Sequence, residues 1–437
     1  MSDRKDLDRP HYIKISDADI GGIFPSSLEY NPPARGMWNI VHTGMLVPGA
    51  HEIFACAQGC LRGVILTAAE MFELDRLSWI SVSEEDMFDG TLESDIIDGV
   101  CEIIEKLGHR PPVVLLYLSC IHLFAGVDFD VIINELGSRY EDIFFVDCYM
   151  TPTMRTTVSP VMKMSAQVYG ALKPLPLNEK SVAIVGNDRA TDEDSELVKI
   201  IKQNGFKLYD ICNCRSFDEY LQMAEAAVNI SYIPTGVLAG EELSQRFGSK
   251  HLHLTVSYDF DDIEENYRTL CDALGIELPD FTDEKSEAEK ALENAKMIIG
   301  DTPVAVDYTA VTRPFELAKL LCEHGFDVRY IVADSAGAEA EAFEWLKENR
   351  PELLIYSPVN VNMLEMPDEE HEHILAVGQK AAYYFATDNF VNMIVGGGYY
   401  GFSGIKKIAD LMVDAHLNKK DRAEYLKLKG MGCASCL

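Results

Sequence analysis

Three cysteines at the ends of apolar runs are the residues of this chain best suited to chemistry. Cys56 and Cys60 lie in the segment Ala55–Cys60, and Cys120 closes the run Tyr117–Cys120. Such runs are typical of buried strands, whose ends present side chains at one edge of a sheet. Thiolates gathered there suit an iron–sulfur cluster, because iron prefers sulfur ligands. The alternative is ordinary burial, since cysteine is among the most buried residue types.

A second cysteine motif lies at the C-terminus, where Cys433 and Cys436 form a CxxC. Such a pair can chelate a metal or a cluster, or it can cycle as a redox couple. One CxxC supplies only two ligands, so a functional pair would have to complete a site elsewhere. The alternative is a terminal segment with two exposed thiols.

Three histidines are weaker candidates. His42 precedes the cysteine-bearing strand and could donate a proton to a substrate, although a turn or capping role is the alternative. His251 and His253 alternate along a predicted strand and therefore share one face, which suits metal chelation. Packed or surface histidines at a strand edge are the alternative for this pair.

The elements that must position these residues repeat an α/β pattern. The first repeat has apolar runs at Glu52–Ala55, Pro112–Leu118 and Ile143–Val146, with a helical apolar face at Glu93–Leu107. A strand, a helix and a further strand in this order predict a parallel sheet. In such sheets ligands bind beyond the carboxyl ends of the strands, which is where the cysteines are expected.

Two further repeats follow. Their predicted strands and helices are Ser181–Gly186, Glu196–Asn204, Lys207–Tyr209, Pro303–Val306, Pro314–His324, Val328–Val332 and Glu352–Tyr356. The charged segment Asp280–Asn294 is typical of an exposed helix that joins domains. We therefore expect an α/β fold with domains at 1–172, 173–298 and 299–418, followed by a tail at 419–437.

Composition excludes several classes of function. The chain has 437 residues, of which 47% are hydrophobic, and a formal net charge of -33. This charge argues against nucleic acid or an anionic membrane as a partner, because both require a basic surface. Neither a signal peptide nor a membrane-length apolar run is recognisable. We expect a cytoplasmic protein whose 11 cysteines serve as thiols or ligands and not as a disulfide framework.

The order of elements and five short segments resemble the nitrogenase component 1 family. These segments are Gln58–Cys60, Ser83–Gly90, Ser119–Cys120, Asp147–Pro152 and Tyr399–Gly404. The resemblance implies three Rossmann-like parallel-sheet domains around a central cleft. It also implies a homodimer, or a heterodimer with a sister subunit, that holds a 4Fe-4S or larger iron–sulfur cluster at the subunit interface. A separate iron–sulfur ATPase would deliver the electrons.

Carried onto this chain, the resemblance assigns Cys60 and Cys120 as interface-cluster ligands. A further family ligand is missing, because Ser78–Ser81 occupies its place, and Cys56 is the expected substitute. The cysteine that binds the active-site cofactor in the molybdenum–iron catalytic subunit is also missing, since Ser231–Gly236 stands there. Either a second metallocofactor is carried by a sister subunit, or the cleft holds a different substrate or cofactor.

The resemblance therefore implies a nitrogenase-like oxidoreductase subunit that relays low-potential electrons to a substrate or cofactor in the cleft. One alternative is a scaffold that assembles and transfers an iron–sulfur cofactor, which the CxxC at Cys433 and Cys436 would suit. Another alternative is a binding protein without a cluster. No phosphate-binding loop of the form Gly-x-x-x-x-Gly-Lys-[Ser/Thr] occurs, so we do not expect this chain to hydrolyse ATP itself.

Overall fold

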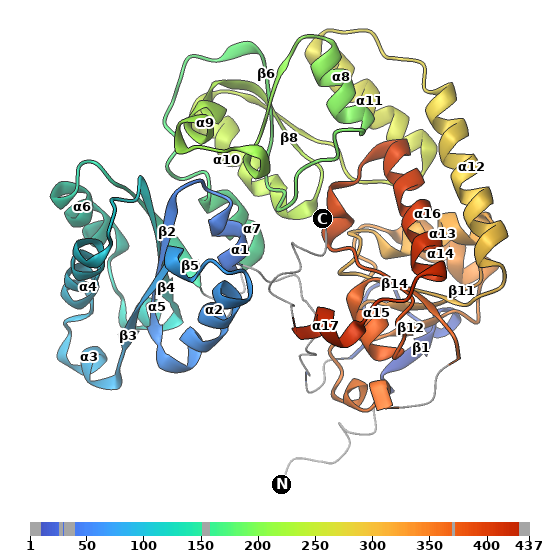
Figure 1. Cartoon of the computed structure of the whole chain (residues 1–437), viewed down its shortest axis with the longest axis horizontal. Helices are drawn as coiled ribbons and strands as arrows, with labels where there is room; N and C mark the ends of the chain where they lie inside the picture. The colour runs from blue at the N-terminus through green and yellow to red at the C-terminus, as the bar shows by residue number, and fades with distance from the viewer. Residues whose placement is uncertain (1–9, 26–28, 30–39, 151–157, 369–371, 428–437) are drawn as a thin grey trace. The chain divides into compact units, whose positions relative to one another are not determined.

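The computed structural model describes residues 10–25, 29, 40–150, 158–368 and 372–427, with the elements labelled in Figure 1. The chain divides into two compact units. Unit 1 comprises Met1–Met37, Thr191–Ile200 and Val256–Leu437, and unit 2 comprises Trp38–Ala190 and Ile201–Thr255. In the described residues the strands form three sheets with mostly parallel pairing, which confirms the α/β fold class. The sequence-based domain boundaries stay predictions.

The first sheet of unit 2 carries the candidate cysteines and has the strand order β3-β2-β4-β5. Its strands are β2 (Ala50–Ala57), β3 (Leu77–Val82), β4 (Val113–Ser119) and β5 (Phe144–Met150). All three pairings are parallel. Every residue of β4 is buried, as expected for a parallel strand that is covered on both faces.

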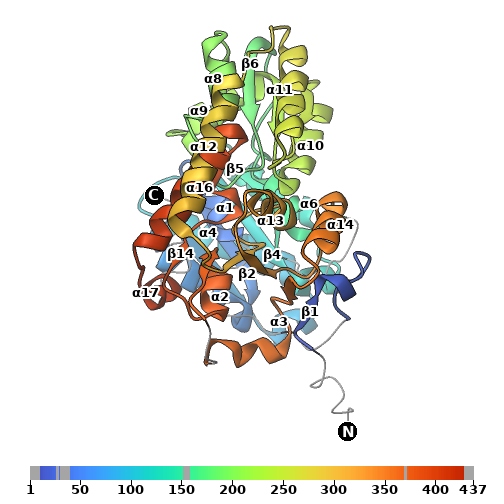
Figure 2. The same ribbon diagram turned by 90° about the vertical axis from the view of Figure 1, so that its right-hand side faces the viewer.

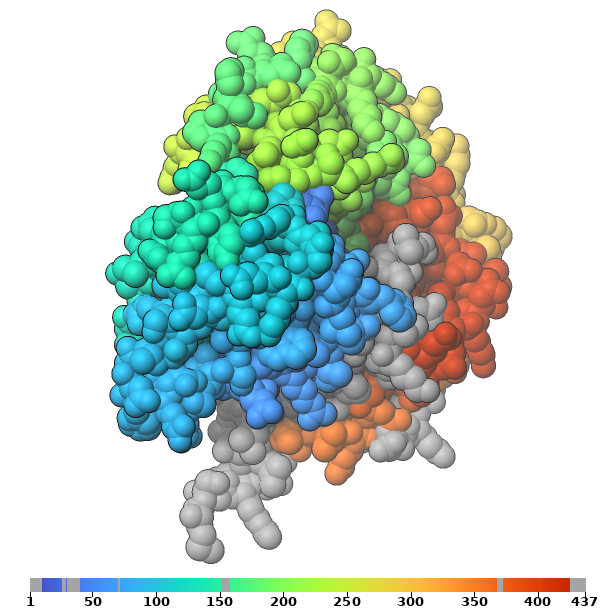
Figure 3. Space-filling view, turned by 60° about the vertical axis from the view of Figure 1, so that its left-hand side comes forward, coloured from blue at the N-terminus to red at the C-terminus, as the bar shows by residue number. Residues whose placement is uncertain are grey.

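Helices cover both faces of this sheet (Figure 1). One face packs against α4 (Leu92–Lys106) and α6 (Phe129–Arg139). The other packs against α1 (Ile40–Met45), α2 (Gln58–Glu70) and α7 (Pro160–Gln167). The short helices α3 (Glu84–Asp89) and α5 (Cys120–Ala125) directly follow β3 and β4. These blue to green elements form a broad outer surface in the space-filling view (Figure 3).

The second sheet of unit 2 has the parallel order β7-β6-β8-β9. Its strands are β6 (Asn178–Ile184), β7 (Lys207–Asp210), β8 (Ala226–Ser231) and β9 (Lys250–His253). The helices α9 (Phe217–Gln222) and α10 (Val237–Phe247) contribute to one hydrophobic core that is shared with the first sheet. The predicted strand with His251 and His253 is therefore confirmed as β9.

The sheet of unit 1 has the order β1-β12-β11-β10-β13-β14. Its strands are β1 (Tyr12–Lys14), β10 (Val304–Asp307), β11 (Val328–Val332), β12 (Leu354–Tyr356), β13 (Leu375–Val377) and β14 (Phe390–Val391). β1 is antiparallel to β12, and the other pairings are parallel. β10 lies centrally, and the strand order reverses between β10 and β13.

The helices of unit 1 include the predicted charged helix. They are α11 (Phe260–Leu274), α12 (Thr282–Ile299), α13 (Pro314–Glu323), α14 (Ala340–Asn349), α15 (Gln379–Tyr384), α16 (Gly401–Leu417) and α17 (Arg422–Lys427), together with the start of α8 (Glu196–Gln203). α12 is less exposed than its charge predicts, because it lies beside α16 and buries residues such as Ala288 and Leu292 (Figure 2). Over the described ranges, no helix is both long and apolar enough to cross a bilayer.

Candidate functional site

Two of the predicted cluster cysteines lie at neighbouring strand ends of unit 2. β2 pairs with β4 in parallel, so the carboxyl ends of both strands meet at the same edge of the sheet. Cys60 lies in the first turn of α2, directly after β2, and Cys120 is the first residue of α5, directly after β4. The thiol of Cys60 is exposed, and Cys120 is half-buried. The fold therefore brings Cys60 and Cys120 to one sheet edge, as the sequence predicts.

A local hydrogen-bond pattern fixes the backbone on which Cys120 sits. The Ser119 N–H donates to Nδ1 of His122 over 3.1 Å, so the ring closes the first turn of α5. The Sγ atom of Cys120 lies 4.0 Å from the carbonyl oxygen of Met150, at the end of the next strand. The start of α5 is thus held in place from within the same sheet edge.

Cys56 has a different environment. It lies within β2 and its side chain has 0% exposure, packed in the core below α2. Burial, with a smaller contribution from Cys60, raises the pKa of the Cys56 thiol to about 12. A metal ligand must be a thiolate, and burial in apolar surroundings opposes that form. Cys56 therefore fits a core role better than a ligand role in this arrangement.

The described residues alone do not complete a cluster site. Within residues 10–25, 29, 40–150, 158–368 and 372–427, no three His, Cys, Asp or Glu side chains converge in a way that could hold a metal ion. Cys433 and Cys436 lie outside the described residues. Cys60 and Cys120 have the thiol donors that an iron–sulfur cluster uses, and any further ligands of a cluster would have to come from elsewhere. All of these ligand assignments stay predictions.

His42 occupies a structural position in unit 2. It lies in α1, it is 6% exposed, and its Nε2 is 3.0 Å from the carbonyl oxygen of Asp188. Because a carbonyl oxygen only accepts, the proton on Nε2 is donated to Asp188. This contact disfavours release of that proton to a substrate, and the catalytic role of His42 stays a prediction.

A carboxyl group is buried on the same strand as Cys56. Glu52 has 0% exposure, and neither of its carboxyl oxygens has a hydrogen bond of good geometry. The hydroxyl of Tyr117 adjoins it but donates to the Ile40 carbonyl over 3.4 Å. Burial raises the pKa of Glu52 well above its ordinary value. Gly44 leaves room for this group, since a Cβ there would lie 2.0 Å from Glu52 Oε1.

Large apolar side chains are exposed close to the cysteine edge. Phe88 on α3 is 88% exposed and Phe124 on α5 is 82% exposed. These helices follow β3 and β4, so both rings belong to elements at the carboxyl edge of the first sheet. Exposed apolar groups that gather in this way mark interaction surfaces. Phe88 belongs to the segment Ser83–Gly90 that stood out in the sequence, whereas no sequence signal pointed to Phe124.

Unit 1 has a polar group at its own strand ends that the sequence reading missed. Asp307 ends β10 and has 0% exposure. Its carboxylate accepts hydrogen bonds from the backbone N–H groups of Thr309, Ala310 and Ala381. Gly378 makes room for it, since a Cβ there would lie 2.1 Å from Asp307 Oδ2. The only sequence signal was a polar residue at the end of an apolar run.

A buried lysine completes this polar group. Lys380 is 3% exposed, and its Nζ donates to the Tyr308 hydroxyl over 2.8 Å. Burial lowers the pKa of Lys380, and the carboxylates of Asp307 and Asp334 oppose that effect. Gln379 beside it is also buried and has an unpaired Oε1 atom. These buried side chains lie directly after β10 and at the start of α15, and they are candidates for holding a polar ligand.

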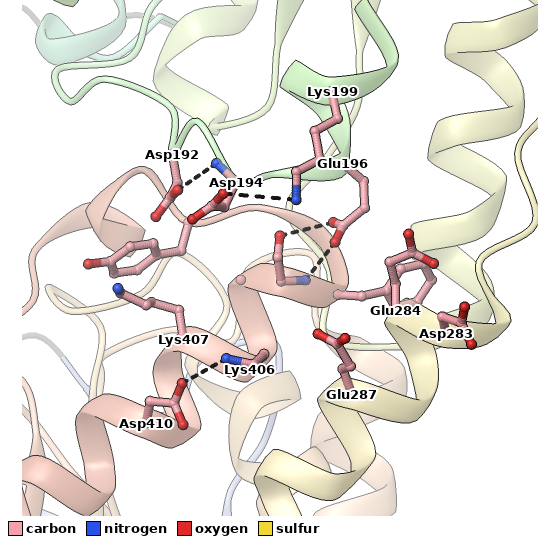
Figure 4. Close-up of a pocket in the computed structure, with 14 residues that line it drawn as sticks. Asp192, Asp194, Glu196, Lys199, Asp283, Glu284, Glu287, Lys406, Lys407 and Asp410 are labelled. Carbon is pink, nitrogen blue, oxygen red and sulfur yellow. Dashed lines mark hydrogen bonds and ion pairs between the residues drawn. The ribbon is translucent and has the colours of Figure 1, made fainter. Parts of the chain in front are cut away.

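A polar cavity of about 390 Å³ lies elsewhere in unit 1 and contains none of these groups (Figure 4). Glu196 at its rim accepts hydrogen bonds from the N–H and hydroxyl of Ser403 and from the Tyr267 hydroxyl. These contacts fasten Glu196 to the first turn of α16. Lysines and carboxylates on the cavity wall pair with one another, as Lys406 does with Asp410. Because these charged groups pair with one another, the cavity wall fits a structural role better than a ligand-binding role.

The turn before α16 has the glycine spacing of a dinucleotide-binding motif, at Gly396, Gly398 and Gly401. In that motif the start of the helix binds a pyrophosphate. Here the Glu196 carboxylate already accepts a hydrogen bond from the Ser403 N–H at the start of α16, where a pyrophosphate would bind. The motif match therefore does not indicate a nucleotide site.

Comparisons with known proteins agree with this architecture. The family model described as nitrogenase component 1 type oxidoreductase matches residues 41–416. A solved structure described as nitrogenase Cp1 at pH 6.5 is similar with a TM-score of 0.69 and 14% identity, over 90% of this chain and 94% of that chain. Another, nitrogenase Cp1 at pH 5, has a TM-score of 0.56 and 12% identity, over 93% of each chain. No curated protein matches.

Proposed function

Because this chain belongs to the nitrogenase component 1 type oxidoreductase family, we propose that it is the catalytic-component subunit of a nitrogenase-like reductase. An interface iron–sulfur cluster would relay low-potential electrons to a substrate or cofactor bound beyond the carboxyl ends of the strands. Iron–sulfur clusters supply one-electron transfer at tunable potential. The protein would contribute the thiolates, a shielded edge and the polar groups that hold the electron acceptor.

The observation that carries this proposal is the position of Cys60 and Cys120. They follow adjacent parallel strands, β2 and β4, and reach one edge of the sheet from two different helix starts. Two thiolates on one chain are half of what a four-iron cluster needs. A second copy or a sister subunit that presents the same edge would supply the rest, as a twofold interface requires.

The exposed rings of Phe88 and Phe124 support an interface at this edge. Apolar groups of this size are normally buried, and they would be covered if another subunit packed against α3 and α5. Covering the edge would also exclude water from a cluster bound there. We therefore propose a homodimer, or a heterodimer with a sister subunit.

The electron donor would be a separate iron–sulfur ATPase. This chain has no phosphate-binding loop of its own, so energy from ATP would have to enter through a partner. The net charge of -33 favours a donor whose docking face is basic.

Iron and acid-labile sulfide, with electron paramagnetic resonance on anaerobically purified protein, test the proposal. Wild type should contain iron and sulfide, and Cys60→Ala and Cys120→Ala should each lose most of both. Cys101→Ala is the matched control, because Cys101 lies on α4 towards the other end of the sheet and should not affect iron content. A folded, dimeric wild type without iron would contradict the electron-relay proposal.

A second measurement separates the reductase from the cluster scaffold. Transfer of intact cluster from this chain to an apoprotein, without ATP-dependent reduction by a partner, would favour the scaffold. Reduction of the cluster by an ATP-hydrolysing donor, with the cluster retained over many cycles, would favour the reductase.

A further inference from the structure

Two imidazoles share one serine hydroxyl in the second sheet of unit 2. The Oγ atom of Ser231 lies 2.9 Å from Nε2 of His251 and 2.9 Å from Nδ1 of His253. Ser231 ends β8 and pairs directly with His253 on β9, and His251 lies one pleat earlier on the same side. The prediction that the two histidines share one face of the strand is thus confirmed, and the Ser231 hydroxyl lies between their rings.

The bridging hydroxyl is sealed from solvent. Ser231 has 0% exposure. The loops after β6 and β8 touch at Gly186 and Gly236, where a Cβ on Gly186 would lie 2.0 Å from the Cα of Gly236. A Cβ on Gly236 would in turn lie 3.1 Å from that of Ser231. Because side chains at both glycines would collide, the two loops close directly over the serine.

The two rings are accessible to different degrees. His251 is half-buried and lies against Gly240 of α10, where a Cβ would be 2.2 Å from the ring. His253 is exposed and lies at the carboxyl end of β9. In the described part of the chain, the outer nitrogens of both rings, Nδ1 of His251 and Nε2 of His253, have no hydrogen-bond partner. Protons can therefore reach Ser231 through either ring but not from water directly.

The chemistry of a hydroxyl makes the two hydrogen bonds interdependent. A serine hydroxyl has one proton to donate, and it accepts through its lone pairs. The hydroxyl proton can point to one ring at a time. When both rings are neutral and both contacts are hydrogen bonds, one ring nitrogen must accept that proton while the other donates its own.

We propose that His251, Ser231 and His253 form a proton relay to the carboxyl edge of the second sheet. A proton binds Nδ1 of His251, and the proton on Nε2 passes to Ser231 Oγ. The hydroxyl proton of Ser231 passes at the same time to Nδ1 of His253. Nε2 of His253 then releases its proton to the substrate that is being reduced. One proton enters, one leaves, no electron moves, and both rings change tautomer.

This relay deepens the proposed function and rests on it for its purpose. Adding electrons to a substrate bond requires protons, and ligands of α/β sheets bind beyond the carboxyl ends of the strands. His253 lies at such an end. Serine transfers the proton without becoming a nucleophile, because its burial keeps any substrate away.

The surrounding charges are compatible with neutral rings. Burial lowers the pKa of both histidines, and His253 adds a repulsive contribution at His251. A hydrogen bond with the Ser231 backbone opposes the lowering at His253. The carboxylate of Glu241 on α10 acts in the opposite direction on His251. Neutral rings can change tautomer, whereas a permanently charged pair would hold its protons.

Ring nitrogen NMR of the full-length chain, labelled with 15N-histidine, tests the relay independently of iron and substrate. In wild type, Nε2 of His251 and Nδ1 of His253 should show complementary protonation, and their titrations should be coupled, with apparent pKa values separated by about one pH unit or more. Ser231→Ala should abolish the complementary protonation and reduce the coupling to what the direct repulsion between the two rings produces. Ser244→Ala is the matched control, since its hydroxyl donates to the Ser249 carbonyl and not to either ring.

A functional readout complements the spectra. If the donor system is reconstituted, Ser231→Ala should form product at least about tenfold more slowly, with iron content and cluster reduction unchanged. His253→Gln provides a second variant, because an amide at this exposed position can still bond Ser231 but cannot pass a proton. Independent titrations in wild type that Ser231→Ala leaves unaltered would overturn the relay. Coupled histidines in an iron-free wild type would keep the relay and refute the electron-transfer function.

Discussion

Replacing Cys56 by alanine distinguishes a cluster ligand from a core residue. The sequence groups Cys56 with Cys60 as possible ligands, whereas the structure buries its thiol among apolar side chains of β2 and α2. We expect Cys56→Ala to keep its iron and lose stability. Cys60→Ala should show the reverse, because the Cys60 side chain is exposed and packs little.

The magnitudes follow from the burial of Cys56. A rise in the pKa of its thiol from an ordinary value of 9.0 to about 12 makes the thiolate up to about 4 kcal/mol less stable there than on an exposed cysteine. Removing the sulfur leaves a small cavity, which should cost about 1–2 kcal/mol of the free energy of unfolding. Cys56→Ser should cost more, since it buries a hydroxyl among apolar groups.

The assay combines iron content per chain with denaturant unfolding of the anaerobic protein. For Cys56→Ala we expect iron equal to that of wild type and a lower unfolding midpoint. Loss of half or more of the iron at an unchanged midpoint would refute the core role and make Cys56 a ligand. Cys60→Ala, measured in parallel, gives the iron content and the unfolding midpoint that are expected when a ligand is lost.

Three further predictions follow from buried and exposed groups. Glu52 keeps a proton in the folded state that the unfolded chain releases above about pH 4.5, so stability should fall with rising pH by up to about 1.4 kcal/mol per pH unit until the raised pKa is reached. Glu52→Gln should remove that slope in denaturant titrations between pH 5 and 8, and parallel slopes would contradict the prediction. Gly378→Ala, at φ +120°, should destabilise by about 3 kcal/mol or more, mainly through its collision with a carboxylate. Gly337→Ala, at φ +53° in open space, should cost about 1 kcal/mol, and equal costs would be inconsistent with a collision. Phe124→Ser should weaken subunit association in sedimentation experiments, whereas Leu74→Ser, which also alters an exposed apolar group but just before β3 begins, should not.

Local patterns made most of the elements predictable. The helix expected at Pro314–His324 is α13 (Pro314–Glu323), and the strand expected at Pro112–Leu118 is β4 (Val113–Ser119). Both are specified by apolar spacing and by a residue that begins or ends the element. The position of Cys60 and Cys120 at one edge followed from the parallel sheet alone.

Other features depend on residues that are distant in the chain. The contact between Lys380 and Tyr308 joins the first turn of α15 to the turn after β10, and no local pattern links these two segments. Likewise, the sequence placed His251 and His253 on one face but could not show that Ser231 lies between them. The burial of Cys56 beneath α2 also depends on packing, because a CxxxC spacing is equally compatible with an exposed turn.

The pairing of β1 with β12 has a consequence for how the chain is made. Tyr12 lies opposite Tyr356, so β1 leaves the ribosome before the rest of its sheet, whose other strands are synthesised more than 280 residues later. The last residue of unit 2, Thr255, is synthesised before β12, so unit 2 can fold while β1 is still unpaired. Long-range pairings of this kind close slowly. β1 is therefore a part of the newly made protein that needs protection by chaperones until unit 1 folds, and a substitution that breaks its pairing with β12 should disturb a late step of folding and not an early one.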